Sequence, residues 1–350
     1  MENRGVSGDL LPKLKISRFR EQVSRNTVKS VGSGCAGLGS KQMGEKLTRR
    51  EFIQKAGIVG VTTVGLGLGG MDLLGGLLPE QVEAAGGPVL SIASGSNPEA
   101  MVKRAIDGLG GISKFVKRGN SVCIKPNIAW ARTPAQAANT NPEVLAAVIK
   151  LCKQAGASKI TVVDHTCDPS SVAFSMSGAK KVCSDLGVRI NAGESHGNYR
   201  RINIPHGKIL KSDECMNDIL EADVFINIPI AKQHGSGIVT GSMKNLMGIT
   251  WDRGQWHKTD LHQCIADYAS AVRPKLVILD AVRVLLTNGP KGPGKTKDVG
   301  QVVASTDFVA IDAYAATLIG KSPSEVGHIV HAFALNLGQM NLAKVAMKRV

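Results

Sequence analysis

Residues whose side chains can do chemistry are concentrated in one stretch of the chain, residues 224–257. The stretch opens with the apolar run 224–228, which predicts a buried strand, and it continues as a glycine-rich segment that predicts a loop. The chemistry-bearing residues of this segment are Lys232, His234, Thr240, Lys244 and Asn245. Because ligands of α/β sheets bind beyond the carboxyl ends of strands, we expect a binding site here.

The chemistry expected of these side chains is anion binding combined with proton transfer. Lysine holds carboxylates and phosphates as a compact charge, and a buried lysine can also act as a base or form a Schiff base. We assign His234 and Lys232 as candidate catalytic residues, since an unperturbed imidazole titrates at about pH 6.5. Thr240 or Ser242 is expected to cap a short helix, whose amino terminus would then be ready to receive an anion.

A further lysine and asparagine follow an earlier strand. Residues 121–125 predict a strand that ends at Lys125, and Asn127 comes two residues later. We expect Lys125, Lys232 and Lys244 to converge on one small anionic ligand at the carboxyl edge of the sheet, with asparagines orienting it. The alternative is that each lysine simply extends to solvent.

Aspartates at strand ends suggest a metal site with mixed oxygen and nitrogen ligands. Asp164 and Asp280 each follow a predicted strand, and His257 closes the central stretch. We predict these three residues as candidate ligands of a divalent metal. The alternative is that each aspartate caps a turn or the next helix. His328 and His331 stand one helical turn apart, a spacing that without acidic neighbours indicates an ordinary helix face.

The elements that must position these residues alternate between strand and helix from residue 85 onward. Short apolar runs predict strands, and Asn141 followed by Pro142 predicts the start of a helix. A succession of strands and helices at short intervals favours a parallel sheet that is covered on both faces. We therefore predict a single α/β domain over residues 85–350, with three layers, α/β/α, around a mostly parallel central sheet.

Composition narrows the classes of ligand. The chain has 43 Lys and Arg residues against 28 Asp and Glu residues, and this basic balance favours an anionic ligand or surface, although the charges are scattered. Aromatic residues make up only 4%, without interleaved basic and aromatic runs, so nucleic acid is not expected as a partner. The seven cysteines show neither C-x-x-C spacing nor a ferredoxin-type run, so a self-contained iron–sulfur cluster is not expected.

One nucleotide-binding pattern is present and is rejected. Residues 289–296, GPKGPGKT, match the P-loop expression letter for letter. A P-loop cradles phosphates with successive backbone N–H groups and leads into a helix, whereas this segment has prolines at two variable positions and precedes a predicted strand. We expect a rigid loop at the rim of the pocket here, and no ATP site.

The first 84 residues predict a leader. Residues 1–46 are polar and aperiodic, which indicates disorder or an upstream start-site error with Met43 as the true start. Residues 47–84 resemble a twin-arginine export signal, with Arg49, Arg50 and Phe52 followed by a glycine-rich apolar run and small residues near Ala84. The resemblance implies the Tat translocase as a partner and a periplasmic or extracytoplasmic location. If the signal is not cleaved, it would leave a membrane anchor.

Several blocks in a fixed order resemble the domain-of-unknown-function family numbered 362. They are CIKPN at 123–127, INIP at 226–229, TGSMKNLMG at 240–248, RPKL at 273–276 and DFVAIDA at 307–313. The resemblance covers roughly residues 121–337 and implies no particular reaction. Members of that family are often found with iron–sulfur segments, but this chain lacks the cysteine runs that such segments need.

These observations lead to two hypotheses about function. The first is an exported protein that binds a small anionic ligand, with a divalent metal as a further candidate, and acts on it. The second is a non-catalytic accessory protein of the cell envelope that carries a cofactor to a redox partner.

Overall fold

The computed structural model describes residues 87–350, so the leader predicted over residues 1–84 lies outside the described residues. The strands are β1 (Val89–Ser94), β2 (Ser121–Pro126), β3 (Lys159–Val163), β4 (Arg189–Asn191), β5 (Tyr199–Asn203), β6 (Ser212–Met216), β7 (Val224–Ile228), β8 (Ile230–His234), β9 (Ile238–Thr240), β10 (Leu276–Leu285), β11 (Thr296–Ser305) and β12 (Ala346–Arg349). The α-helices are α2 (Pro98–Asp107), α3 (Pro142–Gln154), α4 (Ser170–Met176), α5 (Ala179–Asp185), α6 (Asn217–Glu221), α7 (Ser242–Asn245), α8 (Gly254–Lys258), α9 (Leu261–Ala271), α10 (Phe308–Leu318) and α11 (Gly327–Ala334).

The main sheet has the strand order β12-β1-β11-β10-β7-β2-β3-β4, with β8 and β9 joined to it beside β10. Strands β4, β3, β2, β7 and β10 pair in parallel. Along this path β11 runs against its neighbours β1 and β10. The prediction of an α/β fold with a mostly parallel sheet is therefore confirmed. Strands β5 and β6 form a separate antiparallel pair.

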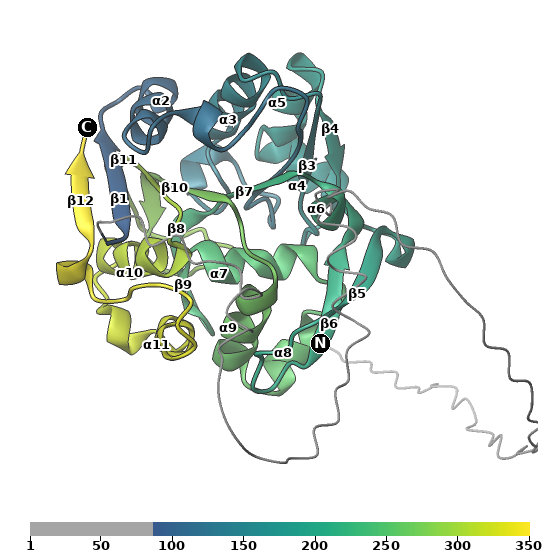
Figure 1. Cartoon of the computed structure of the whole chain (residues 1–350), viewed down its shortest axis with the longest axis vertical. Coiled ribbons are helices and arrows are strands. Elements are labelled where there is room, and N and C mark those ends of the chain that lie inside the picture. Colours follow the sequence, from purple (N-terminus) through teal and green to yellow (C-terminus); the bar gives the residue numbers. More distant parts are fainter. Residues whose placement is uncertain (1–86) are drawn as a thin grey trace, which may run out of the picture. The chain divides into compact units, whose positions relative to one another are not determined.

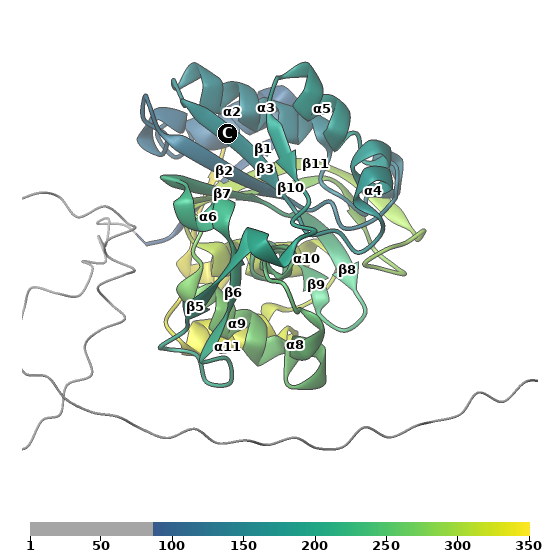
Figure 2. The same ribbon diagram turned by 90° about the vertical axis from the view of Figure 1, so that its right-hand side faces the viewer.

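Helices cover both faces of the sheet (Figures 1 and 2). Alternate residues of a strand point to opposite faces, so Ile124 and Ile226 pack toward α2, α3 and α5, whereas Cys123 and Phe225 pack toward α9, α10 and α11. Helix α3 begins where the sequence predicts: Asn141 accepts a hydrogen bond from the Glu143 N–H at its start, with Pro142 in the first turn. Among residues 87–350, no helix is long and apolar enough to span a membrane.

The glycine-rich segment after β7 forms regular secondary structure, whereas the sequence predicts a loop. It forms a hairpin of β8 and β9, in which Lys232 lies opposite Thr240 and His234 lies opposite Ile238. The prediction of a loop was wrong because β8 also pairs in parallel with β10, which gives this polar segment a place in the sheet. At the start of β9, Ile238 has a φ angle of 64°, which is uncommon for a β-branched residue.

Candidate functional site

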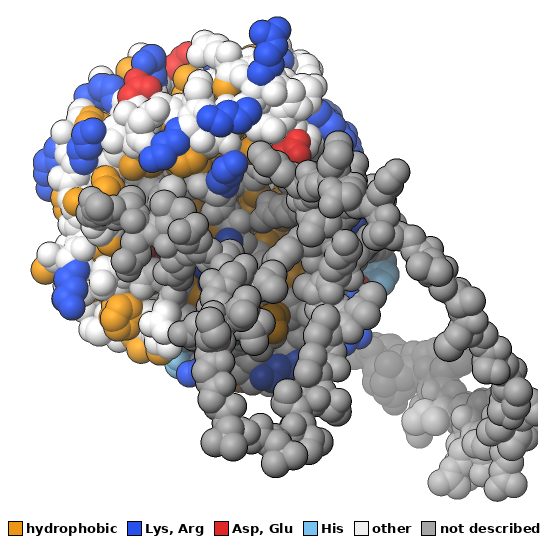
Figure 3. Space-filling view, viewed as in Figure 1, with side chains coloured by type: hydrophobic (Ala, Val, Ile, Leu, Met, Phe, Trp, Pro, Cys, Tyr) orange, Lys and Arg blue, Asp and Glu red, His pale blue; other side chains and the backbone are white. Residues whose placement is uncertain are grey.

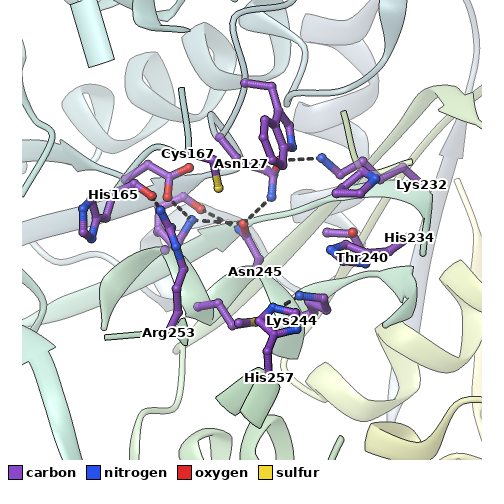
Figure 4. A pocket seen from close by; sticks show the side chains of 17 residues that line it. Asn127, His165, Cys167, Lys232, His234, Thr240, Lys244, Asn245, Arg253 and His257 are labelled. Carbon is purple, nitrogen blue, oxygen red and sulfur yellow. Dashed lines mark hydrogen bonds and ion pairs between the residues drawn. The ribbon is translucent and has the colours of Figure 1, made fainter. Parts of the chain in front are cut away.

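A cavity of about 280 Å³ lies beyond the carboxyl ends of β2, β3 and β7, at the edge of the sheet where ligands of α/β proteins bind. Nearly all of the predicted site residues contribute to its wall (Figure 4). Those that do are Lys125, Asn127, Asp164, Lys232, His234, Thr240, Lys244, Asn245 and His257. Asp280 does not line the cavity.

Lys125 and Asp164 form a buried ion pair in the wall. The Lys125 Nζ donates to Asp164 Oδ1 at 2.8 Å, and the other carboxylate oxygen accepts the Ile128 N–H at 2.5 Å. Both side chains are at most 2% exposed. Burial lowers the pKa of Lys125, and the Asp164 carboxylate opposes that shift. Lys125 therefore has its charge neutralised within the protein and is not available to neutralise a ligand.

The two asparagines orient lysines instead of a ligand. Asn127 accepts from Lys232 Nζ at 3.0 Å through its Oδ1 and donates to Asn245 Oδ1 at 2.8 Å. Asn245 Oδ1 also accepts from Lys125 Nζ at 3.0 Å, and its Nδ2 donates to Asn227 Oδ1 at 2.8 Å. Because these bonds use the main donors and acceptors of both amides, Asn127 and Asn245 are the scaffold that fixes Lys125 and Lys232.

Lys232 is a buried cation without a carboxylate. Its Nζ donates to Asn127 Oδ1 at 3.0 Å and to the Ala138 carbonyl at 2.5 Å, and the residue is 1% exposed. An ammonium group has three N–H donors, so one is left for the cavity. Burial lowers the pKa of Lys232 to about 7, against the opposing effect of Cys167 and Asp164 and with a smaller lowering by the charges of Lys244 and Lys125.

Lys244 is a second cation without a carboxylate. Its Nζ has Met247 Sδ, at 3.0 Å, as its hydrogen-bond partner among the described residues, and a thioether is a weak acceptor. Burial lowers the pKa of Lys244 to about 8. Its aliphatic stem crosses Gly237 of the hairpin, where an added Cβ would lie only 2.5 Å from Lys244 Cδ and Cε. Glycine at position 237 therefore allows Lys244 to reach the cavity.

His234 is neutral and accepts a hydrogen bond at Nδ1. The Gly237 N–H donates to its Nδ1 at 3.2 Å, so this nitrogen carries no proton and the proton sits on Nε2. Burial, followed by the charges of Lys244 and Lys232, lowers the pKa of His234 to about 2. The expectation that His234 titrates near neutral pH is thus wrong for this structure, because the ring is largely buried and two ammonium groups lie close to it.

The amino terminus of α7 is already occupied. Neither Thr240 nor Ser242 caps this helix: the Asp312 carboxylate of α10 accepts the N–H groups of Ser242 and of Met243, the latter at 3.0 Å. Burial raises the pKa of Asp312 to about 7, against the effect of these two N–H groups. The expected anion site at this helix end is therefore filled by the protein itself, and Asp312 fixes the position of Lys244 and Asn245.

The predicted metal ligands do not come together. Asp280 accepts the Asn141 N–H at 2.7 Å and the Val282 N–H at 3.0 Å, so it holds backbone at the start of α3, and burial raises the pKa of Asp280 to about 6. Asp164 is engaged by Lys125 in a buried ion pair. Within residues 87–350, no group of three or more His, Cys, Asp or Glu side chains is placed to hold a metal ion.

Several wall residues were not predicted. Arg253 donates to the His165 carbonyl at 2.6 Å and the Thr166 carbonyl at 2.7 Å. The other wall residues that were not predicted include Ala129, Trp130, Cys167 and Met247. Arg253 lies inside the stretch 224–257, but no spacing in the sequence distinguishes it from a surface arginine.

The P-loop-like segment lies at the cavity and leads into a strand, as the sequence predicts. Pro290 contributes to the rim of the cavity, and the segment leads into strand β11 instead of a helix. A strand in this place does not offer the run of helix-terminal N–H groups on which phosphate binding by a P-loop depends.

Comparison with known protein families shows to which family the chain belongs. The family model named "Domain of unknown function (DUF362)" matches residues 122–317, and the chain belongs to this family. Among curated proteins, it is similar to the "Thylakoid-associated protein sll1697" of Synechocystis sp., with 28% identity over 235 residues, 65% of this chain and 71% of that protein.

Solved structures show weaker similarity. The lactate racemase apoprotein from Thermoanaerobacterium thermosaccharolyticum has a TM-score of 0.40 and 14% identity over 62% of this chain. A protein of Thermotoga maritima has a TM-score of 0.41 and 9% identity over 65% of this chain. The chain covers 54% and 60% of these two proteins.

Proposed function

We propose that this member of the family is an exported protein that binds a small anionic ligand in the cavity and acts on it. The observation that carries the proposal is that Lys232 and Lys244 line one cavity as buried ammonium groups, with no carboxylate partner in the described part of the chain. Burying a charge without a partner is costly, and a bound anion would offset that cost. The Lys and Arg side chains on the surface are scattered over the visible face in Figure 3. The overall basic charge of the protein therefore does not account for two buried lysines that line the same cavity.

The proposed roles differ from one side chain to the next. Lys232 and Lys244 neutralise the anion, and His234 Nε2–H and the Thr240 hydroxyl donate hydrogen bonds to it. Lys232 is also the residue suited to move a proton, because its pKa of about 7 matches a neutral working pH, whereas the pKa of about 2 for His234 does not.

Substituting either lysine tests the proposal. We expect Lys232→Met and Lys244→Met each to weaken the binding of inorganic phosphate or acetate by about tenfold or more, because each removes a desolvated charge partner. Both variants should nevertheless unfold at a higher temperature than the wild type when no ligand is present, since a buried unpaired charge is replaced by an apolar side chain. Titration calorimetry and thermal unfolding measure the two effects.

A lysine on the surface supplies the control. Lys181 of α5 is exposed and pairs with Asp185, so Lys181→Met should change neither the affinity nor the unfolding temperature appreciably. Unchanged anion affinity in both cavity variants, or failure of every anion to bind the wild type, would contradict the proposal.

Export is the second part of the proposal and is supported by the pattern of residues 47–84. We expect Arg49→Lys combined with Arg50→Lys to retain the protein in the cytoplasm, because the paired arginines are the signal that the translocase reads. Cell fractionation measures this, with Arg20→Lys, outside the predicted signal, as the control. Equal export of the double variant and the wild type would refute this part.

A further inference from the structure

Four hydrogen-bond donors face the cavity from one small region, the β8–β9 hairpin and the adjoining helix α7. Lys232 lies directly opposite Thr240 in the antiparallel pair, a position that brings their Cβ atoms to about 4.5–5.5 Å. His234 is two residues from Lys232 and so lies on the same face of the hairpin. Lys244 reaches this face across Gly237, whose added Cβ would lie 3.6 Å from His234 Nδ1. Figure 4 shows these side chains grouped on one side of the cavity.

Each of these donors has hydrogen-bonding capacity that the described residues do not use. Lys232 Nζ has one free N–H, and Lys244 Nζ has two besides its contact with Met247 Sδ. His234 presents Nε2–H. The hydroxyl of Thr240 is the independent sign of a ligand: the residue is 3% exposed, and its Oγ1 has no hydrogen-bond partner within residues 87–350. A buried polar atom without a partner is rare in native proteins.

The charges of the wall set the charge of the ligand. Four basic side chains and one carboxylate line the cavity, and Lys125 neutralises that carboxylate. Arg253 donates to the backbone carbonyl groups of His165 and Thr166 and lies apart from the group of donors (Figure 4). Lys232 and Lys244 are therefore the two cations that remain at the group of donors. A ligand with one negative charge would leave one of these two ammonium groups buried and unpaired.

We infer that the cavity binds the dianionic phosphoryl group of a small phosphate monoester. The inference rests on the proposed function and deepens it by naming the class of ligand. A phosphoryl group carries close to two negative charges at neutral pH and presents three acceptor oxygens from a single centre, which suits two cations and two neutral donors that converge. Dicarboxylates carry the same charge but divide it between two separated groups.

The remaining residues of the cavity wall indicate that the organic group of the phosphate monoester is short. Trp130, Met247, Pro290 and Ala129 supply mostly apolar surface around the group of donors. The volume of about 280 Å³ lies at or below the lower end of the range for small-molecule pockets, about 300–1,000 Å³. A monoester with a few carbon atoms fits this space better than a nucleotide does.

Two phosphate esters of nearly equal size test the inference. Methyl phosphate is mainly a dianion at about pH 7, because its second ionisation lies near about pH 6, whereas dimethyl phosphate is a monoanion. We expect the full-length protein to bind methyl phosphate at least about tenfold more tightly than dimethyl phosphate, succinate or acetate in titration calorimetry. Lys244→Met should remove most of this preference.

A pair of glycine variants in the hairpin tests the role of Lys244 without removing its charge. In Gly237→Ala the new Cβ meets the flexible end of Lys244, so affinity for methyl phosphate should fall by about tenfold while the unfolding temperature changes little. Gly235→Ala, where the nearest atom to the new Cβ is the Gly289 carbonyl oxygen at 3.8 Å, should change neither quantity.

The possible failures are distinguishable. Equal affinity for the two esters, or tighter binding of succinate than of methyl phosphate, would overturn the inference while leaving anion binding intact. Failure of all four anions to bind would overturn the proposed function as well.

Discussion

Asp164→Ala is expected to lower the free energy of unfolding by about 3–5 kcal/mol, the range found when one partner of a buried ion pair is removed. The substitution leaves the Lys125 ammonium buried with only neutral acceptors, Asn245 Oδ1 and the Pro126 carbonyl. It also removes the acceptor of the Ile128 N–H. Denaturant unfolding monitored by circular dichroism measures the change.

A second aspartate offers a matched control. Asp168 also pairs with a lysine and accepts a backbone N–H, but its partner Lys291 is 43% exposed. Loss of this ion pair in Asp168→Ala should therefore lower the free energy of unfolding by about 1 kcal/mol or less. Gly248→Ala should resemble Asp164→Ala, since its Cβ would collide with Asp164 Oδ1 and lie 2.8 Å from Lys125 Nζ. Equal effects of Asp164→Ala and Asp168→Ala would show that the Lys125 pair is not a buried pair.

The affinity for a phosphate monoester should fall by on the order of five hundredfold as the pH rises from about 7 to about 9. The pKa values of Lys232 and Lys244 in the free protein are about 7 and about 8, so both lose their protons within this interval. Binding requires the ammonium forms, whereas the ester remains a dianion throughout. Titration calorimetry at three or more pH values measures the slope.

The stability of the ligand-free protein should change in the opposite direction over the same interval. Both pKa values lie below the value of about 10.4 for lysine in an unfolded chain, so the unfolded state binds more protons. Where the unfolded state binds more protons, the free energy of unfolding rises with pH. A parallel fall of affinity and stability from about pH 7 to about pH 9 would contradict the assignment of buried, unpaired lysines.

The layer architecture and the position of the site could be predicted because both depend on local pattern. Apolar runs and capping residues such as Asn141 identify strands and helix starts, and the rule that ligands bind at carboxyl ends of strands then places Lys125, Lys232 and Lys244 at one edge. The convergence of these lysines on one cavity follows the prediction.

The separate roles of the site residues could not be predicted, because each role depends on hydrogen-bond and ion-pair partners that are distant in sequence. Asp164 lies 39 residues from Lys125, and Asp312 lies 69 residues from Met243, whose N–H it accepts. No local pattern shows that Asp312 occupies the start of α7, or that Asp280 holds the backbone at Asn141. The hairpin was missed for the same reason, since its pairing with β10 is non-local.

Proton uptake during ligand binding tests the central claim most directly. Titration of the wild-type protein with methyl phosphate at about pH 8, in buffers that differ in ionisation enthalpy, yields the number of protons bound with each ligand. With pKa values of about 7 for Lys232 and about 8 for Lys244, we predict an uptake of more than one proton. Binding without net proton uptake would contradict the claim that the two lysines receive the anion.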